Sequence, residues 1–243
     1  MITSFVAIDI ETTGLSPEEN QIIEVGALRV REGEVVETLS ILINPGISLP
    51  QKIVELTGIT DEMLMGQQSF REHSKTIYEF LGDEPLLGHN IRFDYSFLKY
   101  HLANSGHTIN NKVLDTLTIA KALHPEFLSR SLASMCSAYG LVNKAAHRAF
   151  EDARVTMELY LEMCRRIQST SEEERKALMP LTEPTNCYVK VKKQEPITAK
   201  QKIYLNDLLK YHKINKALEI DKMTKSQASK AIDHIILNYG KIR

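Results

Sequence analysis

Two acidic side chains near the start of the chain have the spacing that a metal site needs. Asp9 and Glu11 lie two residues apart in an apolar segment that predicts a strand, so both point to one face of it. Two residues span about 6.6 Å of strand, and carboxylates at that spacing can share two divalent ions roughly 3.5–4 Å apart. An exposed strand end produces the same pattern, and the pair taken alone favours that plainer interpretation.

Two further acids occur where helices are expected to begin. Asp94 follows Asn90, the expected N-cap of one helix, and Asp152 lies in the first turn of another. A helix N-terminus favours the anionic form of a carboxylate. His147 belongs to the loop before Asp152, and an imidazole in that place is suited to take a proton from an attacking water.

These residues fall into three stretches, and each stretch is a weak signal by itself. In chain order they read Asp9-x-Glu11-Thr12-Thr13-Gly14, His89-Asn90-x-x-Phe93-Asp94 and His147-x4-Asp152. Together they resemble the three motifs of the DEDDh family of 3′→5′ exonucleases, which includes the proofreading epsilon subunits of bacterial DNA polymerase III. The resemblance covers residues 1–168. His147 favours this branch over the one with tyrosine, because the position four before Asp152 is an arginine.

The resemblance implies a fold, a cofactor and a reaction. The fold would be α/β and ribonuclease H-like, with a mixed five-stranded sheet flanked by helices. Asp9 would bridge two divalent ions, Mg²⁺ or Mn²⁺, which both accept oxygen ligands. Glu11 and Asp152 would hold one ion, and Asp94 would help to hold the other. His147 would act as the general base, and the reaction would release nucleoside 5′-monophosphates from single-stranded DNA 3′ ends in proofreading or repair.

Residues beside the acids are candidates for binding the terminal nucleotide. Leu15 is expected either to wedge beside the terminal base or to be a core or rim residue. Asn90 is expected to contact the substrate or only to cap its helix. Phe93 is expected to stack on a base or to pack in the core. The segment Leu56–Asp61 resembles one that the family carries near the bound 3′ end, whereas His89 fits a packed histidine better than a ligand. The candidates are Thr12, Thr13, Gly14, Leu15, Thr57, Asn90 and Phe93.

The order of predicted elements supports an α/β domain, because three strands precede an alternation of helices and strands. The predicted strands are Ser4–Ile10, Ile22–Val30, Val35–Ile43, Pro85–Gly88 and Lys112–Asp115. The predicted helices are Phe70–Leu81, Ile91–Leu102, Leu117–Leu123, Ser131–Tyr139 and Phe150–Ile167. We therefore expect an exonuclease domain over residues 1–168, a linker over 169–196 and a basic helical module over 197–243.

The predicted module differs from the rest of the chain in charge. Residues 190–243 contain 13 Lys/Arg and 5 Asp/Glu, although the whole chain has a net charge of −1. Thr198 and Thr224 each begin a T-x-x-Q sequence, which is typical of a capping box at a helix start. A basic segment beside an acidic body suggests a nucleic-acid partner, and a solvated lysine-rich helix surface explains it equally well.

Composition leaves several alternatives open. With 43% hydrophobic residues and no apolar run near the roughly 20 that cross a bilayer, no membrane partner is expected. Three cysteines without a CxxC pair fit a reduced, cytoplasmic setting. The alternatives to a DNA exonuclease are a 3′→5′ RNA exonuclease and a non-catalytic nucleic-acid-binding or polymerase scaffold subunit. A DNA polymerase is a candidate partner.

Overall fold

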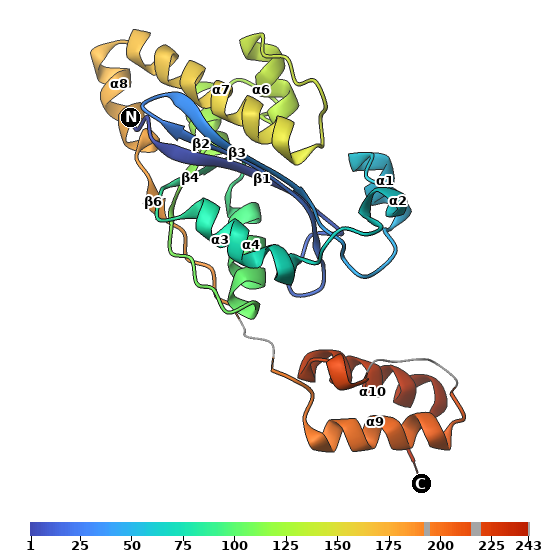
Figure 1. Ribbon diagram of the computed structural model, residues 1–243. Coiled ribbons are helices and arrows are strands. Elements are labelled where there is room, and N and C mark those ends of the chain that lie inside the picture. Colours follow the sequence, from blue (N-terminus) through green and yellow to red (C-terminus); the bar gives the residue numbers. More distant parts are fainter. Residues whose placement is uncertain (192–194, 215–219, 243) are drawn as a thin grey trace. The chain divides into compact units, whose positions relative to one another are not determined.

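The chain folds into two compact units, which we describe separately. The computed structural model describes residues 1–191, 195–214 and 220–242. The first unit is Met1–Val191 and the second is Lys192–Arg243 (Figure 1). None of the helices in these three ranges is both long and apolar enough to cross a membrane.

The first unit is built on a mixed sheet with the strand order β3-β2-β1-β4-β5-β6. The first three strands pair antiparallel, β4 and β5 continue the sheet parallel to β1, and β6 pairs antiparallel with β5. The predicted mixed sheet is confirmed, with six strands where five were predicted. The strands are β1 Phe5–Thr12, β2 Ile22–Arg31, β3 Glu34–Leu42, β4 Leu86–Gly88, β5 Lys112–Asp115 and β6 Thr185–Asn186.

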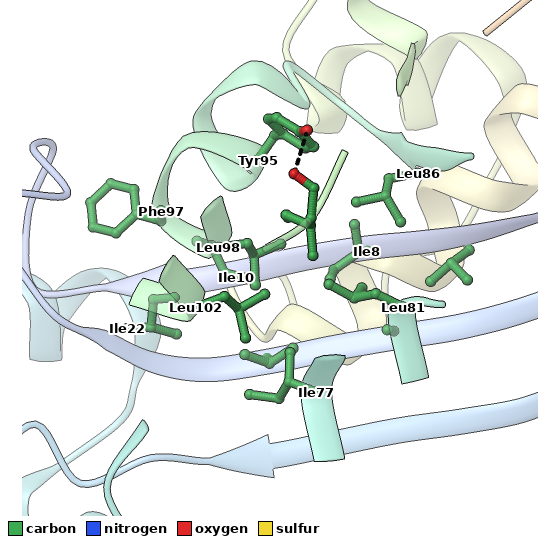
Figure 2. Close-up of a cluster of buried hydrophobic side chains, with 14 of the residues drawn as sticks. Ile8, Ile10, Ile22, Ile77, Leu81, Leu86, Tyr95, Phe97, Leu98 and Leu102 are labelled. Atoms are coloured by element: carbon green, nitrogen blue, oxygen red, sulfur yellow. Dashed lines mark hydrogen bonds between the residues drawn. The ribbon is translucent and has the colours of Figure 1, made fainter. Parts of the chain in front are cut away.

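Helices cover both faces of the sheet, because the central strand β1 is apolar on both faces. Its residues Val6, Ile8 and Ile10 pack against α3 (Phe70–Leu81) and α4 (Arg92–Asn104), as Figure 2 shows for the side chains around Ile8 and Ile10. Phe5 and Ala7 face the opposite cluster, which includes α5 (Thr116–Leu123), α6 (Leu132–Tyr139) and α7 (Ala149–Ser169). Alternation along β1 places Asp9 and Glu11 on this second face.

Helix α7 begins in close contact with β2, and Gly26 makes that approach feasible. A Cβ atom on Gly26 would stand 2.1 Å from the backbone nitrogen of Phe150 and 2.2 Å from the carbonyl carbon of Ala149. Gly26 is also the β2 residue paired with Asp9. The absence of a side chain at this position therefore lets the start of α7 lie directly beside the acidic end of β1.

Residues 169–191 belong to the first unit, so the prediction of a linker is wrong there, and residues 192–194 of the predicted linker lie outside the described residues. Residues 169–191 contain α8 (Glu172–Leu178), the 3₁₀ helix η1 (Met179–Thr182) and β6. Leu178, Met179 and Leu181 pack against the α7 cluster, and Thr182 is fully buried. Glutamates and prolines made this segment resemble a linker, but these three apolar residues are partly buried against α7 within the first unit. Two short helices, α1 (Gln51–Thr57) and α2 (Asp61–Leu64), were also not predicted.

The second unit is a pair of helices with a core of its own. It contains α9 (Ala199–Tyr211), the 3₁₀ helix η2 (Ile220–Lys222) and α10 (Lys225–Tyr239). Both predicted capping boxes are present, with Thr198 and Thr224 as N-caps. The side chain of Gln201 in the first turn of α9 donates to the Lys225 carbonyl at the start of α10, so the two helices start side by side. Their shared core is Leu205, Leu208, Ile232 and Ile235.

We predict that Gly26→Ala lowers the free energy of unfolding by about 3 kcal/mol, because the added methyl meets rigid backbone rather than a flexible side chain. Urea denaturation followed by circular dichroism measures this loss. Ser40 is the β3 residue paired with Gly26, and it is exposed, so it provides the control. Ser40→Ala is expected to change stability by less than about 0.5 kcal/mol. Equal stabilities of the two variants would contradict the close approach.

Candidate active site

Four carboxylates from three elements meet at the end of β1. Asp9 and Glu11 come from β1, Asp94 from the first turn of α4 and Asp152 from the first turn of α7. Oxygen or nitrogen atoms of Glu11, His147 and Asp152 lie within 4.8 Å of one another. Asp94 and Asp152 are buried, and Asp9 and Glu11 are half-buried. The structure thus brings together all five residues that the sequence singled out for catalysis.

Asp94 is held against the backbone of the central strand. Its Oδ1 accepts a hydrogen bond of 3.1 Å from the backbone N–H of Ile10. Strand β4 ends at Gly88, and β1 extends past the last paired residues of β4. The carboxylate therefore satisfies a β1 donor where the neighbouring strand has already ended, and this bond fixes Asp94 beside Asp9.

Asp152 is held by the loop that precedes its helix. Its Oδ1 accepts from Asn143 Nδ2 at 2.5 Å, and its Oδ2 accepts from the backbone N–H of His147 at 3.0 Å. His147 has a left-handed backbone with φ of 62° and is exposed. A non-glycine residue rarely adopts this conformation, and such positions occur often at functional sites. The bond to Asp152 stabilises the turn that presents the histidine.

A buried ion pair anchors the same loop to the sheet, and the sequence alone did not assign it a role. Glu24 of β2 is 1% exposed. Its carboxylate accepts hydrogen bonds from Nη2 of Arg148 at 2.8 Å and from the backbone N–H of Ala149 at 3.0 Å. Glu24 also pairs across the strands with Glu11. A charged residue in the apolar β2 segment was a visible signal, but naming its partner required knowing that α7 begins beside β2.

The acids shift one another's protonation toward the neutral form. Burial raises the pKa of Asp9 well above its ordinary value, and Asp94, Glu11 and Asp152 add to the rise. Burial and the charge of Asp152 raise the pKa of Glu11 to about 8, against a smaller opposing effect of Arg148. Burial raises the pKa of Asp94 to about 8.

Asp152 follows the same trend less strongly. Burial raises its pKa, while the hydrogen bonds from Asn143 and His147 lower it. Crowded carboxylates are stabilised in their charged form by a cation between them. Their hard oxygen donors fit a divalent ion such as Mg²⁺ or Mn²⁺. The donor set therefore agrees with the metal site that the sequence predicted.

The turn after β1 is held by its own hydroxyl groups. Thr12 Oγ1 donates to the Gly14 carbonyl at 2.6 Å, and Thr13 Oγ1 accepts from the backbone N–H of Gln21 at 2.9 Å. A Cβ on Gly14 would stand 2.1 Å from Oδ1 of Asn20, so the turn is tightly closed. Leu15 is 86% exposed beyond this turn, and the interpretation of Leu15 as a core residue is therefore wrong.

The other candidates divide into surface and structural residues. Asn90 does not cap its helix, because α4 starts at Arg92 and Ile91 occupies the N-cap position. Asn90 instead has a φ of 68°, and its backbone N–H donates to Asp115 Oδ1 at 2.8 Å. A small cleft of 310 Å³ beside it is lined by Asn90, Arg92, Phe93, Ser96 and Val189.

Phe93, Thr57 and His89 also have packing partners. Phe93 is half-buried, with its ring centroid 5.0 Å from that of Phe97, so it both lines the cleft and packs on the core. Thr57 is buried and its hydroxyl donates to the Ile53 carbonyl at 2.9 Å within α1, which favours a structural role. His89 bonds Thr116 and the Arg130 carbonyl through its two ring nitrogens, as expected for a packed histidine.

Comparison with known proteins places this site in a family. Residues 6–160 match the RNase_T exonuclease family. The DNA polymerase III PolC-type protein of Clostridium perfringens is 38% identical over 155 residues, which cover 64% of this chain but only 11% of that protein. The DNA polymerase III subunit epsilon of Aquifex aeolicus is 35% identical over 161 residues, which cover 66% of this chain and 80% of that subunit.

A solved structure shares the fold. Exonuclease X in complex with 5′ overhanging duplex DNA superposes with a TM-score of 0.57 at 22% identity, over 74% of this chain and 99% of that one. The likeness extends the ribonuclease H-like assignment from motifs to the arrangement of strands and helices. With the family match over residues 6–160 and the Aquifex aeolicus relative, it follows that the chain belongs to the RNase_T family of DnaQ-like 3′-5′ exonucleases.

Proposed function

We propose that the chain is a metal-dependent 3′→5′ exonuclease that removes nucleoside 5′-monophosphates from single-stranded 3′ ends, with DNA preferred. The observation that carries this proposal is the meeting of four carboxylates beside an exposed histidine at the end of β1. Raised pKa values at such a cluster are typical of a site that binds a cation or handles protons. A purely structural role would leave these crowded acids without compensation.

The acidic residues would hold two divalent ions, Mg²⁺ or Mn²⁺. Asp9 would serve both ions, and the support for this role is that the charges of the other three acids all act on Asp9. Glu11 and Asp152 would bind one ion together, and Asp94 would help to bind the other. When bound, such ions supply Lewis-acid stabilisation of the attacking and leaving oxygens of a phosphodiester. Glu24 stays outside this set, since Arg148 already neutralises it.

His147 would accept the proton of the attacking water. Its ring stands beside Glu11 and Asp152 on an exposed loop, so it can reach both the site and the solvent. An imidazole side chain can take a proton from a water molecule and release it to solvent in each turnover. The backbone bond to Asp152 and the Arg148–Glu24 pair keep this loop in place.

DNA is the preferred substrate in this proposal because relatives more than 30% identical are named as parts of DNA polymerase III. Proofreading or repair of DNA ends is the corresponding role, and a DNA polymerase is the corresponding partner. The acidic site itself binds phosphates and does not distinguish the sugar. An RNA exonuclease is therefore the rival that an experiment must separate.

The test is degradation of matched single-stranded DNA and RNA oligonucleotides, carrying either a 5′ or a 3′ label, with Mg²⁺ or Mn²⁺. We expect a ladder from the 5′ label, an immediate mononucleotide from the 3′ label, and faster loss of DNA. Asp9→Asn should slow the reaction roughly a thousandfold or more, since it removes several kcal/mol of charge stabilisation. Faster loss of RNA would favour the rival, and an unaffected Asp9→Asn variant would refute the site.

His147→Ala in the same assay should lower kcat by about 10² to 10⁴, the usual contribution of a general base. His234, exposed on α10, supplies the matched control, and His234→Ala should leave kcat unchanged.

We also predict that a rise in pH lowers the stability of the fold and that metal binding raises it. Glu11 titrates near 4.5 in the unfolded chain and at about 8 in the fold, so the native state holds a proton that the unfolded state has released. Its contribution to stability is therefore present at low pH and is lost as pH rises from 4.5 to about 8. Added Mn²⁺ should raise the unfolding midpoint temperature more at pH 8 than at pH 6, because the ion replaces the proton.

Thermal unfolding with and without Mn²⁺ measures this difference, and Glu11→Gln should reduce it. Glu173, exposed in the first turn of α8, is the control, and Glu173→Gln should preserve the full difference. A metal-induced gain that is identical at both pH values would contradict this prediction.

The Glu24–Arg148 pair should respond unequally to the loss of either partner. Arg148→Met leaves a carboxylate that is 1% exposed without a counter-charge, at a cost of about 3–5 kcal/mol. Glu24→Gln leaves Arg148 without its partner, but the Arg148 side chain is 37% exposed and can turn to water, so this substitution costs less. Both should lower kcat roughly 10- to 100-fold because they release the His147 loop.

Urea denaturation and single-turnover rates check both expectations. Arg165, whose side chain is paired with Glu162 on the exposed face of α7, serves as the control. Arg165→Met should cost less than about 1 kcal/mol and leave kcat unchanged. Wild-type kcat in Arg148→Met would show that the pair is structural only.

A further inference from the structure

One face of α9, in the second unit, carries exposed side chains that the proposed active site does not use. Six exposed positions of α9 lie outside the core stripe of Leu205 and Leu208, with Tyr204 and Tyr211 at its border and the other four farther around the helix. All six are exposed, and we call them the α9 face: Lys200, Ile203, Tyr204, Asp207, Lys210 and Tyr211. Figure 1 shows α9 packed beside α10 within this unit.

The aromatic and apolar residues of the α9 face are not needed for packing. The core of the unit is already formed by Leu205 and Leu208 together with Ile232 and Ile235 of α10. Ile203 is 62%, Tyr204 36% and Tyr211 52% exposed. Tyr204 and Tyr211 are seven residues apart, so they lie on one side of the helix about 10.5 Å apart along its axis. Exposed rings in such a row offer flat surfaces on which unpaired bases stack.

The lysines of the α9 face are available for an outside partner. Lys202 and Lys225 are paired with Asp221 and Glu195, respectively. Lys200 and Lys210, in contrast, make no ion pair with any residue that the structure describes. Asp207 is the acid on this face, so the face carries two lysines against one aspartate. The surrounding segment 190–243 has 13 basic and 5 acidic residues, which favours a polyanionic partner.

We propose that the α9 face binds single-stranded nucleic acid, with Tyr204 and Tyr211 stacking on bases and Lys200 and Lys210 contacting phosphates. The inference rests on the proposed function, since the bound strand is the one that the exonuclease shortens. A single strand is specified because duplex bases are already stacked on each other and present only their edges. The tyrosine rings match the unpaired bases of such a strand, and the lysines of the α9 face match its phosphates.

The test is fluorescence anisotropy of the full chain with a labelled oligodeoxythymidine in EDTA, which keeps the strand intact. The double variant Tyr204→Ala/Tyr211→Ala should weaken binding about 10- to 100-fold, because each base stack contributes appreciably to affinity. Lys200→Gln/Lys210→Gln should reduce the slope of log affinity against log salt by about 1.4, the value for two phosphate contacts on a single strand.

Matched controls come from the same unit. Lys213→Gln/Lys241→Gln removes the same charge from exposed lysines outside the α9 face, and Leu237→Ala removes an exposed apolar side chain from α10. Both controls should bind as the wild type does. If both double lysine variants weaken binding equally, the affinity comes from the overall positive charge of the unit, and the α9 face is not a specific site. Unchanged binding in all variants would also overturn the inference and point to a protein partner.

Turnover of a trinucleotide separates this inference from the proposed function. A trinucleotide is too short to need a second binding surface, so the α9 variants should degrade it at the wild-type rate. Loss of that activity in the α9 variants would overturn the inference, because the face would then act through the catalytic centre. If the wild type degrades no oligonucleotide at all, the proposed function fails, whereas the anisotropy result still decides the α9 face.

Discussion

Repulsion among the carboxylates at the end of β1 is the constraint on which the rest of the first unit depends. Asp9 experiences the charges of Asp94, Glu11 and Asp152 in a buried environment, and each of them raises its pKa. Acids so placed separate unless the backbone holds them or a cation joins them. The fold supplies the first kind of restraint and the proposed divalent ions supply the second.

Each restraint uses a different part of the fold. The short strand β4 leaves the Ile10 N–H free to hold Asp94, and a glycine at position 26 lets the start of α7 come close enough to add Asp152. The ion pair of Glu24 and Arg148 then holds the start of α7 against β2. None of these supporting features is a fixed position of the three motifs, yet they decide where the motif residues stand. A site made of mutually repelling groups therefore requires a rigid surrounding fold.

The sequence predicted the elements that follow from periodicity and missed those that follow from tertiary contact. Strand alternation placed Asp9 and Glu11 on one face, and T-x-x-Q sequences located the starts of α9 and α10. The segment 169–196 was misjudged because its glutamates and prolines dominate the local pattern, while burial of Leu178, Met179 and Leu181 depends on the distant α7. Asn90 was misjudged as a cap because its backbone turns left-handed and delays the helix. Pairing of Glu24 with Arg148 needed the packing of α7 on β2, which no local pattern contains.

Charge divides the chain in a way that the catalytic site alone does not explain. Residues 1–189 contain 17 Lys/Arg and 26 Asp/Glu, so the unit that holds the acidic site carries a negative charge. Screening limits such repulsion of a phosphate chain to about 8 Å at physiological ionic strength. Bound divalent ions would reverse the sign of the field at the site itself, but they would not attract the remainder of the strand. In the proposed function, the basic segment 190–243 would supply the attraction that the acidic unit lacks, and the α9 face would add stacking contacts that salt does not screen. In this proposal, capture and hydrolysis of a strand place opposite demands on charge, and two separate units would allow one chain to meet both.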